Sequence, residues 1–286
     1  MSKTIHCDDL DEAIERYKEL GYRLDMIKPA DEPREALLSK DGETLRLKAE
    51  PLASASGTNV DIESASMPSA TADGTDTTGD WITGRAGMEY RDLIPDRLGG
   101  KVIASHIRLT TGGEVPDYVH YHKVDFQMIY CNKGRIKVVY EDQGEPFWLE
   151  TGDCVLQPPE IRHRVLECTA GAEVIEVSMP AEHETWVEHD ITLPTGTINP
   201  DRDFTGQRFV CSRVTEANWE ISGFGGFERR ETGIDAATGG VINVQIFRSV
   251  APRSEELTNA VCEPGKGIAI FTDDGSSLLI DFLKDV

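Results

Sequence analysis

From Trp81 to about residue 180 the chain is a succession of short apolar or alternating segments separated by Gly, Pro and Asp. These segments include KVIASHIRL, DFQMIYC, RIKVVYED, DCVLQPP and EVIEVSMP. β-branched and aromatic residues favour extended backbone, and many short strands at this spacing are typical of an all-β barrel or sandwich. We therefore predict a mainly β chain whose central part, residues 81–195, forms a barrel.

One of these segments, YVHYHKVDFQ, carries two histidines two residues apart. On a strand this spacing places the side chains of His120 and His122 on the same face, so that the two imidazoles can converge. Gln127 follows five residues later, and its amide could complete one side of a coordination sphere. A third histidine, His163, comes after a Gly-Asp turn and a Pro-Pro pair that restricts the start of its strand.

The segments GEVPDYVHYHKVDFQMIYCNKG and GDCVLQPPEIRHRV resemble the two sequence motifs of the cupin superfamily. The resemblance implies a double-stranded β-helix, or jelly-roll barrel, that binds one divalent metal ion on His120, His122, Gln127 and His163. Gln127 stands where these proteins usually have a glutamate, and the other departures affect only turn geometry. Two alternatives remain: the two neighbouring histidines face solvent, or a bound metal serves only the structure.

The glutamine has a chemical consequence, because all four predicted ligands are then neutral. A divalent ion held by them keeps its full charge, so it should bind anionic substrates directly and lower the pKa of a bound water more strongly. Three imidazoles and an amide oxygen also suit a metal with open coordination positions better than a closed structural site. Fe(II) is favoured, while Ni(II), Mn(II) and Zn(II) remain possible.

Further catalytic candidates follow from strand parity and from neighbouring strands. Tyr118 has the parity of His120 and could offer a phenol at the mouth of the barrel, and His106 and Arg108 lie on a preceding strand. The alternative for each is a packing or surface role. We expect the segment 81–100, WITGRAGMEYRDLIPDRLGG, to close the barrel or cover an interface rather than to bind substrate.

Residues 1–50 predict a separate small α+β module with the order strand, helix and three strands. Its signature LDEAIERYKELGYRL resembles one module of the glyoxalase and bleomycin-resistance superfamily. That family builds metal sites from paired modules, whereas this module stands alone with His6, so we expect a structural or dimerising role. Residues 51–80 are rich in Ser, Thr, Gly, Ala and Asp and predict a flexible linker.

The C-terminal part shows an internal similarity at an offset near 140 residues. GGKVIASHIRL (99–109) recurs as GGVINVQIFRS (239–249), and CNKGRIKVVYED (131–142) as TDDGSSLLIDFL (272–283). We therefore predict that residues 196–286 form a second cupin-like repeat, incomplete and without metal, unless the similarity is a chance one between β-rich segments. Its unpaired strand edges predict a homodimer.

Charge and cysteine content exclude several classes of function. With 29 Lys and Arg against 51 Asp and Glu, the net charge of −22 would repel nucleic acid and anionic membranes, and it resembles the acidic composition of proteins from salt-rich cytoplasm. The six cysteines form no CxxC pair, which disfavours a disulfide framework or a zinc ribbon. No signal-like or membrane-spanning segment is evident, so we expect a cytoplasmic protein.

These observations favour a metal-dependent enzyme, specifically a non-haem dioxygenase acting on a small enol, diketone or phenolic substrate that is possibly anionic. One rival is a non-redox zinc enzyme, such as an isomerase, a lyase or a polyketide-cyclase-like protein. The other rival is a non-catalytic cupin that binds a small molecule.

Overall fold

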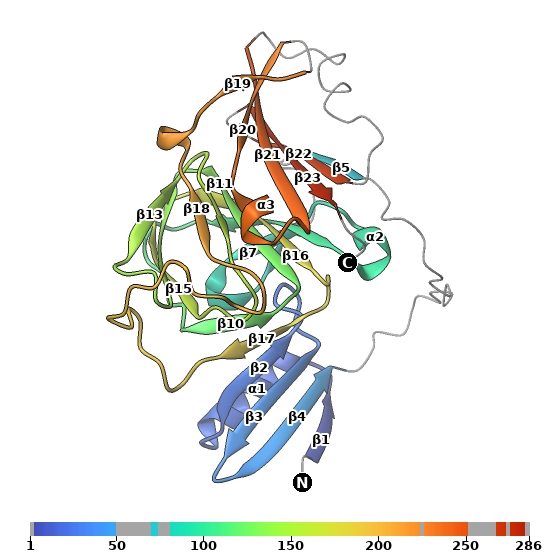
Figure 1. Ribbon diagram of the computed structural model, residues 1–286. Helices are drawn as coiled ribbons and strands as arrows, with labels where there is room; N and C mark the ends of the chain where they lie inside the picture. Colours follow the sequence, from blue (N-terminus) through green and yellow to red (C-terminus); the bar gives the residue numbers. More distant parts are fainter. Residues whose placement is uncertain are drawn as a thin grey trace.

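The computed structural model describes residues 3–49, 70–73, 81–223, 226–250, 267–272 and 275–283. These residues are mainly β and form three sheets (Figure 1). Two of the sheets face each other as a barrel, and the third packs against the outside of the barrel. No helix in these ranges is long and apolar enough to cross a membrane.

The first barrel sheet carries the three histidines. Its strands, in spatial order, are β17 (Glu184–Val187), β10 (His120–Lys123), β15 (His163–Cys168), β12 (Arg135–Tyr140) and β13 (Phe147–Glu150), and β9 (Gly113–Glu114) also pairs with β15. All these pairings are antiparallel. Strand β10 therefore lies between β15 and β17, which places it against strands from distant parts of the sequence.

The second barrel sheet faces the first across the main core. Its strands, in spatial order, are β18 (Val210–Ser212), β14 (Cys154–Leu156), β11 (Phe126–Lys133), β16 (Ala172–Met179), β8 (Ile103–Leu109), β7 (Glu89–Asp92) and β6 (Ile82–Thr83). The short helices α2 (Arg97–Gly100), η1 (Arg85–Gly87) and η2 (Val214–Glu216) lie beside these strands in the chain. The segment 81–100 thus adds edge strands to the barrel.

Successive side chains on these strands point to opposite faces of the second sheet, and apolar side chains pack on both faces. On β11, Ile129 and Cys131 point into the barrel, whereas Phe126, Met128 and Tyr130 point outward. All five side chains are buried because a third sheet covers the outer face. Full burial of one such side chain contributes about 1.5–3 kcal/mol, so the two cores depend on both layers.

The third sheet consists mostly of C-terminal residues. Its strands, in spatial order, are β19 (Glu220–Ile221), β20 (Phe227–Glu231), β21 (Ile242–Ser249), β23 (Ser276–Phe282), β22 (Gly267–Phe271) and β5 (Ala70–Asp73), and α3 (Ile234–Ala237) precedes β21. Ile242, Val244 and Ile246 alternate along β21 and are buried against the barrel. Among the described residues this part is an open sheet. The predicted duplication stays a prediction.

Strand β5 lies within residues 51–80, whose composition predicts a flexible linker without strands. Residues 70–73 pair in parallel with β22, although they lie in the stretch expected to be a linker. The pairing is non-local, and nothing in the short ATAD segment identifies its distant partner. The remaining residues of that stretch, 51–69 and 74–80, lie outside the described residues.

The N-terminal module has the predicted element order. It consists of β1 (Lys3–Cys7), α1 (Leu10–Glu19), β2 (Arg23–Lys28), β3 (Glu35–Lys40) and β4 (Glu43–Ala49). Asp9 caps α1 by accepting a hydrogen bond from the Glu12 amide, as expected of an N-cap aspartate. Strand β2 pairs with β17, so the module extends the first barrel sheet, and β17 separates it from the strand that carries two histidines (Figure 1).

Candidate metal centre

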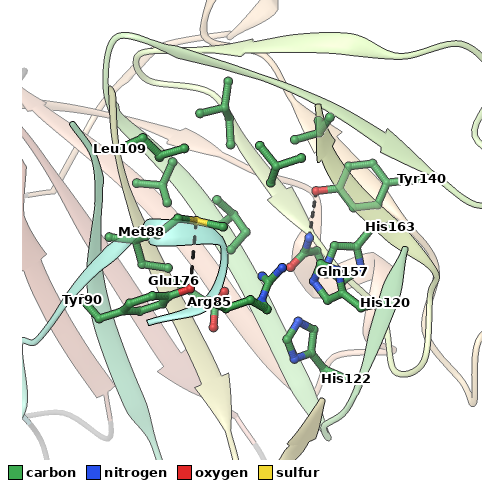
Figure 2. A pocket seen from close by; sticks show the side chains of 16 residues that line it. Arg85, Met88, Tyr90, Leu109, His120, His122, Tyr140, Gln157, His163 and Glu176 are labelled. Atoms are coloured by element: carbon green, nitrogen blue, oxygen red, sulfur yellow. Dashed lines mark hydrogen bonds between the residues drawn. The ribbon is translucent and has the colours of Figure 1, made fainter. Parts of the chain in front are cut away.

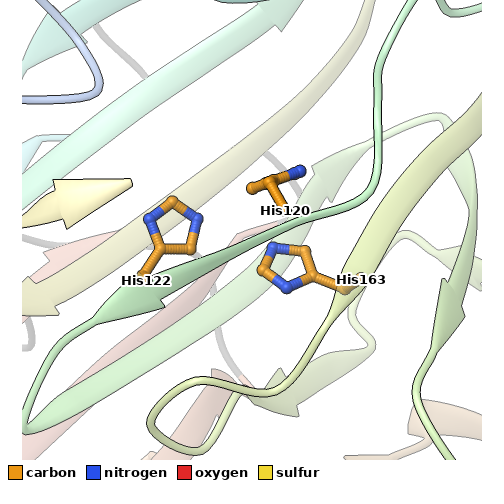
Figure 3. A group of neighbouring side chains, drawn as sticks. All are labelled: His120, His122 and His163. Atoms are coloured by element: carbon orange, nitrogen blue, oxygen red, sulfur yellow. The ribbon is translucent and has the colours of Figure 1, made fainter. Parts of the chain in front are cut away.

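Strand pairing brings the three predicted histidines together. His120 on β10 lies directly opposite His163 on β15, and His122 has the same parity as His120. Their ligand atoms all lie within 4.8 Å of one another, and all three residues are buried. Figure 3 shows the three rings converging between β10 and β15. The structure therefore places these three imidazoles side by side.

Hydrogen bonds to the histidine Nδ1 atoms fix which nitrogen faces the centre. His120 Nδ1 donates to the Tyr118 carbonyl oxygen (2.8 Å), and His163 Nδ1 donates to the Ile161 carbonyl oxygen (2.9 Å). A carbonyl oxygen only accepts, so both rings carry their proton on Nδ1 and keep a lone pair on Nε2. His122 Nδ1 lies 2.9 Å from Thr185 Oγ1, which fits the same tautomer.

Burial keeps these imidazoles neutral. Desolvation is the largest cause that lowers the pKa of His120 and of His122 well below 6.5; the next cause is the positive charge of Arg85 for His120 and the neighbouring His163 for His122. The pKa of His163 falls to about 4, again with desolvation as the largest cause. His120 Nε2 is buried and has no hydrogen-bond partner among the described residues. Three neutral rings with free Nε2 lone pairs fit a divalent transition metal, whose histidine ligands must be deprotonated and oriented by second hydrogen bonds.

The fourth predicted ligand, Gln127, stays a prediction. It is buried on the inward face of β11, and its Nε2 lacks a hydrogen-bond partner within the described part of the chain. Its amide lies beside the carboxyl group of Glu176 on β16 and favours the ionised form of that group. The described geometry therefore brings three histidines together and leaves the Gln127 amide as a further candidate ligand.

The cavity beside the histidines has a polar end and an aliphatic end. Figure 2 shows His120, His122 and His163 together with Arg85, Gln157, Tyr140 and Glu176, and Leu109 and Met88 farther away. Gln157 Nε2 donates to the Tyr140 hydroxyl (2.9 Å). The aliphatic wall is completed by Ile107, Ile129, Ile136, Val138, Val165 and Val174.

The sequence did not single out two charged residues of this cavity. Glu176 lies on the inward face of β16, where desolvation raises its pKa while Arg85 and Gln127 oppose that shift. The available signal was the second glutamate of the otherwise apolar segment EVIEVSMP. Arg85 belongs to the segment expected to be purely structural, and a loop arginine gives no periodic signal of its own.

A fourth buried histidine, His183, also lies close to the site. Its ring centroid is 5.3 Å from that of His122, and its Nδ1 donates to the Pro180 carbonyl oxygen (3.0 Å). It is not part of the three-histidine cluster. Desolvation lowers its pKa, so it too is neutral.

The structure places the other catalytic candidates differently from expectation. His106 and Arg108 lie on the face of β8 opposite to the cavity-lining Ile107 and Leu109. His106 is hydrogen-bonded to Glu173 (2.8 Å) and Arg108 to Glu89 (2.7 Å). We therefore do not assign either residue to the site.

Tyr118 lies closer to the centre. Its ring centroid is 5.9 Å from that of His120, and its carbonyl oxygen orients that histidine. Its phenol does not line the cavity. The structure thus supports a positioning contribution from the Tyr118 backbone rather than a phenol at the reacting centre.

Two facing β-sheets with an inward cluster of three histidines are typical of jelly-roll barrels that can hold one metal ion. Residues 105–178 match the family model described as "Cupin domain". These residues therefore form a cupin domain, and the sequence-based expectation of a cupin resemblance and of a mainly β fold is confirmed. No curated protein matches the sequence.

Solved structures similar to this chain include a mutant of oxalate decarboxylase from Bacillus subtilis, with 12% identity, a TM-score of 0.39, and coverage of 57% of this chain and 53% of that chain. An RmlC-like cupin from Shewanella frigidimarina shows 25% identity, a TM-score of 0.29 and coverage of 36% and 84%. KdgF from Halomonas sp. shows 20% identity, a TM-score of 0.30 and coverage of 36% and 88%. This chain thus spans about half the length of the oxalate decarboxylase.

Proposed function

We propose that the protein is a metal-dependent enzyme, and that its activity is that of a non-haem dioxygenase acting on a small oxygenated organic molecule. The observation that carries the proposal is the convergence of three buried imidazoles with Nε2 lone pairs directed at one point beside a cavity. Fe(II) is the favoured metal. A redox-active divalent ion held there would polarise substrate oxygen atoms and activate O2.

The residues around this point have distinct roles in the proposal. His120, His122 and His163 hold the ion, and Gln127 is the fourth candidate ligand. Tyr118, Ile161 and Thr185 orient the three rings through their Nδ1 atoms. The aliphatic wall excludes water from the far end of the cavity, which strengthens electrostatic interactions at the polar end.

The test is metal analysis of protein purified with and without oxygen, followed by oxygen uptake on a panel of enols, diketones and phenolics. We expect about one equivalent of iron or another redox-active metal, and oxygen consumption that His163→Ala abolishes. Protein that carries zinc and turns over substrate without oxygen would contradict the dioxygenase proposal. Small-molecule binding without turnover of any compound would favour a non-catalytic binding protein.

One observation favours the non-redox alternative, an isomerase or a lyase. Glu176 is a half-buried carboxyl group in the wall of the cavity, and Ser178 Oγ donates to it (3.3 Å). Such a group can accept and return a proton of a bound substrate. Glu176→Gln keeps the side-chain volume and removes this capacity. If the alternative holds, this substitution should lower kcat while leaving the metal content unchanged.

A further inference from the structure

Arg85 reaches the metal centre from outside the segment that matches the cupin family. It belongs to η1, between the edge strands β6 and β7, whereas the family match begins at residue 105. Figure 2 shows its side chain extending along the cavity toward His120 and Gln157. It lowers the pKa of all three histidines, which agrees with a guanidinium close to their rings.

The hydrogen bonds of Arg85 are incomplete. One Nη donates to the Asp117 carboxylate, which itself accepts from the Val165 amide (3.0 Å) and is therefore held in place. The Nε atom of Arg85 is buried and has no partner among the described residues, and the Gln157 Oε1 atom is in the same state. An unpaired buried polar group is energetically costly, so both atoms favour a bound polar ligand or water in the cavity.

The charges around the cavity do not balance once a divalent ion is present. Arg85 contributes +1 and Asp117 contributes −1, while the three histidines are neutral. Glu176 contributes at most −1, because burial disfavours its ionised form. A divalent ion therefore leaves a net charge of at least +1 in a site shielded from water. An uncompensated charge in such a site is costly, and a bound anion would remove that cost.

The space available limits the size of this anion. The cavity has a volume of about 50 Å³, which corresponds to a few waters. Its far end is lined by aliphatic side chains, including Leu109, Val138 and Val174. Such a wall favours a short apolar chain attached to the charged group.

We propose that Arg85 and the metal ion together bind one small carboxylate or enolate with a short aliphatic tail. The anionic oxygen atoms lie between the guanidinium and the ion, and the tail lies along the aliphatic wall. Binding of the metal and of the anion is therefore mutually dependent, and each tightens the other by the same factor. This inference rests on the proposed function only in requiring that the three histidines bind a metal.

The experiment measures Mn(II) affinity by chelator competition, with and without saturating propionate and with propionamide as the neutral analogue. In the wild-type protein we expect propionate to tighten Mn(II) binding by about tenfold or more, and propionamide to have no effect. In Arg85→Gln the Mn(II) affinity without anion should rise, because a nearby positive charge is gone, and the propionate effect should vanish. Arg85→Lys keeps the charge and should retain part of the propionate effect.

Arg135→Gln is the matched control, since Arg135 is exposed and lies over the Trp148 ring away from the cavity. It should behave like the wild type in every measurement. A series from formate to hexanoate tests the tail. We expect affinity to rise about fourfold per methylene, from the usual free energy of burying one such group, and then to fall when the cavity is full.

The outcomes separate the two proposals. Mn(II) binding that propionate leaves unchanged, or tightens equally in wild type and Arg85→Gln, overturns the inference and leaves the metal proposal standing. If no metal binds to the wild-type protein, the proposed function fails, and so does the mutual dependence. Circular dichroism of each variant checks that the fold is retained, and Arg85→Lys supplies a second reading if Arg85→Gln does not fold.

Discussion

The buried histidines predict a specific acid sensitivity of the metal-free protein. The pKa of His163 is lowered from 6.5 to about 4 by burial. Below pH 6.5 the unfolded chain takes up a proton at this position, whereas the folded protein stays neutral there until about pH 4. The free energy of unfolding must therefore fall as the pH falls through this window, because the unfolded state binds more protons.

The size of the effect follows from the two pKa values. Between pH 7 and pH 5, His163 alone should remove roughly 2 kcal/mol of stability, and the loss should level off near 3 kcal/mol below pH 4. His120 and His122 have pKa values lowered in the same direction and add to this loss. The sum is a large part of the 5–15 kcal/mol that is typical of a folded domain.

The assay is urea denaturation of chelator-treated protein at pH 7 and at pH 5, for the wild type and for His163→Gln. Glutamine does not titrate, so the pH-dependent loss of stability in this variant should be smaller by about 2 kcal/mol. Other titrating groups cancel when the two proteins are compared at both pH values. His6→Gln, at an exposed position, is the control and should match the wild type. An identical loss in wild type and His163→Gln would refute the reasoning.

Three further predictions concern the ligands and the assembly. Thr185→Val removes the hydrogen-bond partner of His122, and we expect a metal affinity about 10–100-fold weaker by chelator competition, with unchanged circular dichroism. Gln127→Glu should tighten metal binding if position 127 supplies the fourth ligand. Weaker metal binding, caused by repulsion between the new carboxylate and Glu176, would instead place the Gln127 amide outside the coordination sphere. Light scattering should give twice the chain mass, since open sheet edges invite pairing with a second copy.

The metal centre was predictable because it depends on strand periodicity. A spacing of two residues fixes His120 and His122 on one face whatever the rest of the fold is, and the second motif supplies His163. The pairing of His120 with His163 across β10 and β15 is a long-range contact, and family resemblance rather than local pattern pointed to it. The predicted N-terminal element order followed from equally local signals.

The misplaced candidates show where periodicity stops being informative. Strand β8 is buried on nearly its whole length, because the barrel interior lies on one side and other elements cover the other side. A strand buried on both faces has no polar face to mark the outside, so the sequence could not say which parity faces the cavity. His106 and Arg108 have the outward parity. Arg85 was overlooked for a related reason, because only the folded position of η1 directs it inward.

The N-terminal module extends the sheet that carries the three-histidine cluster. Its strand β2 pairs with β17 at Thr185 and Trp186, and Thr185 in turn lies opposite His122 and bonds to it. Without the module, β17 would become an exposed edge strand one position away from the strand that carries two ligands. The module's own histidine, His6, lies on β1, which is an edge strand of the same sheet. Strands β4, β3 and β2 separate β1 from β17. The module is therefore connected to His122 through the sheet, and we expect its removal to loosen His122 first.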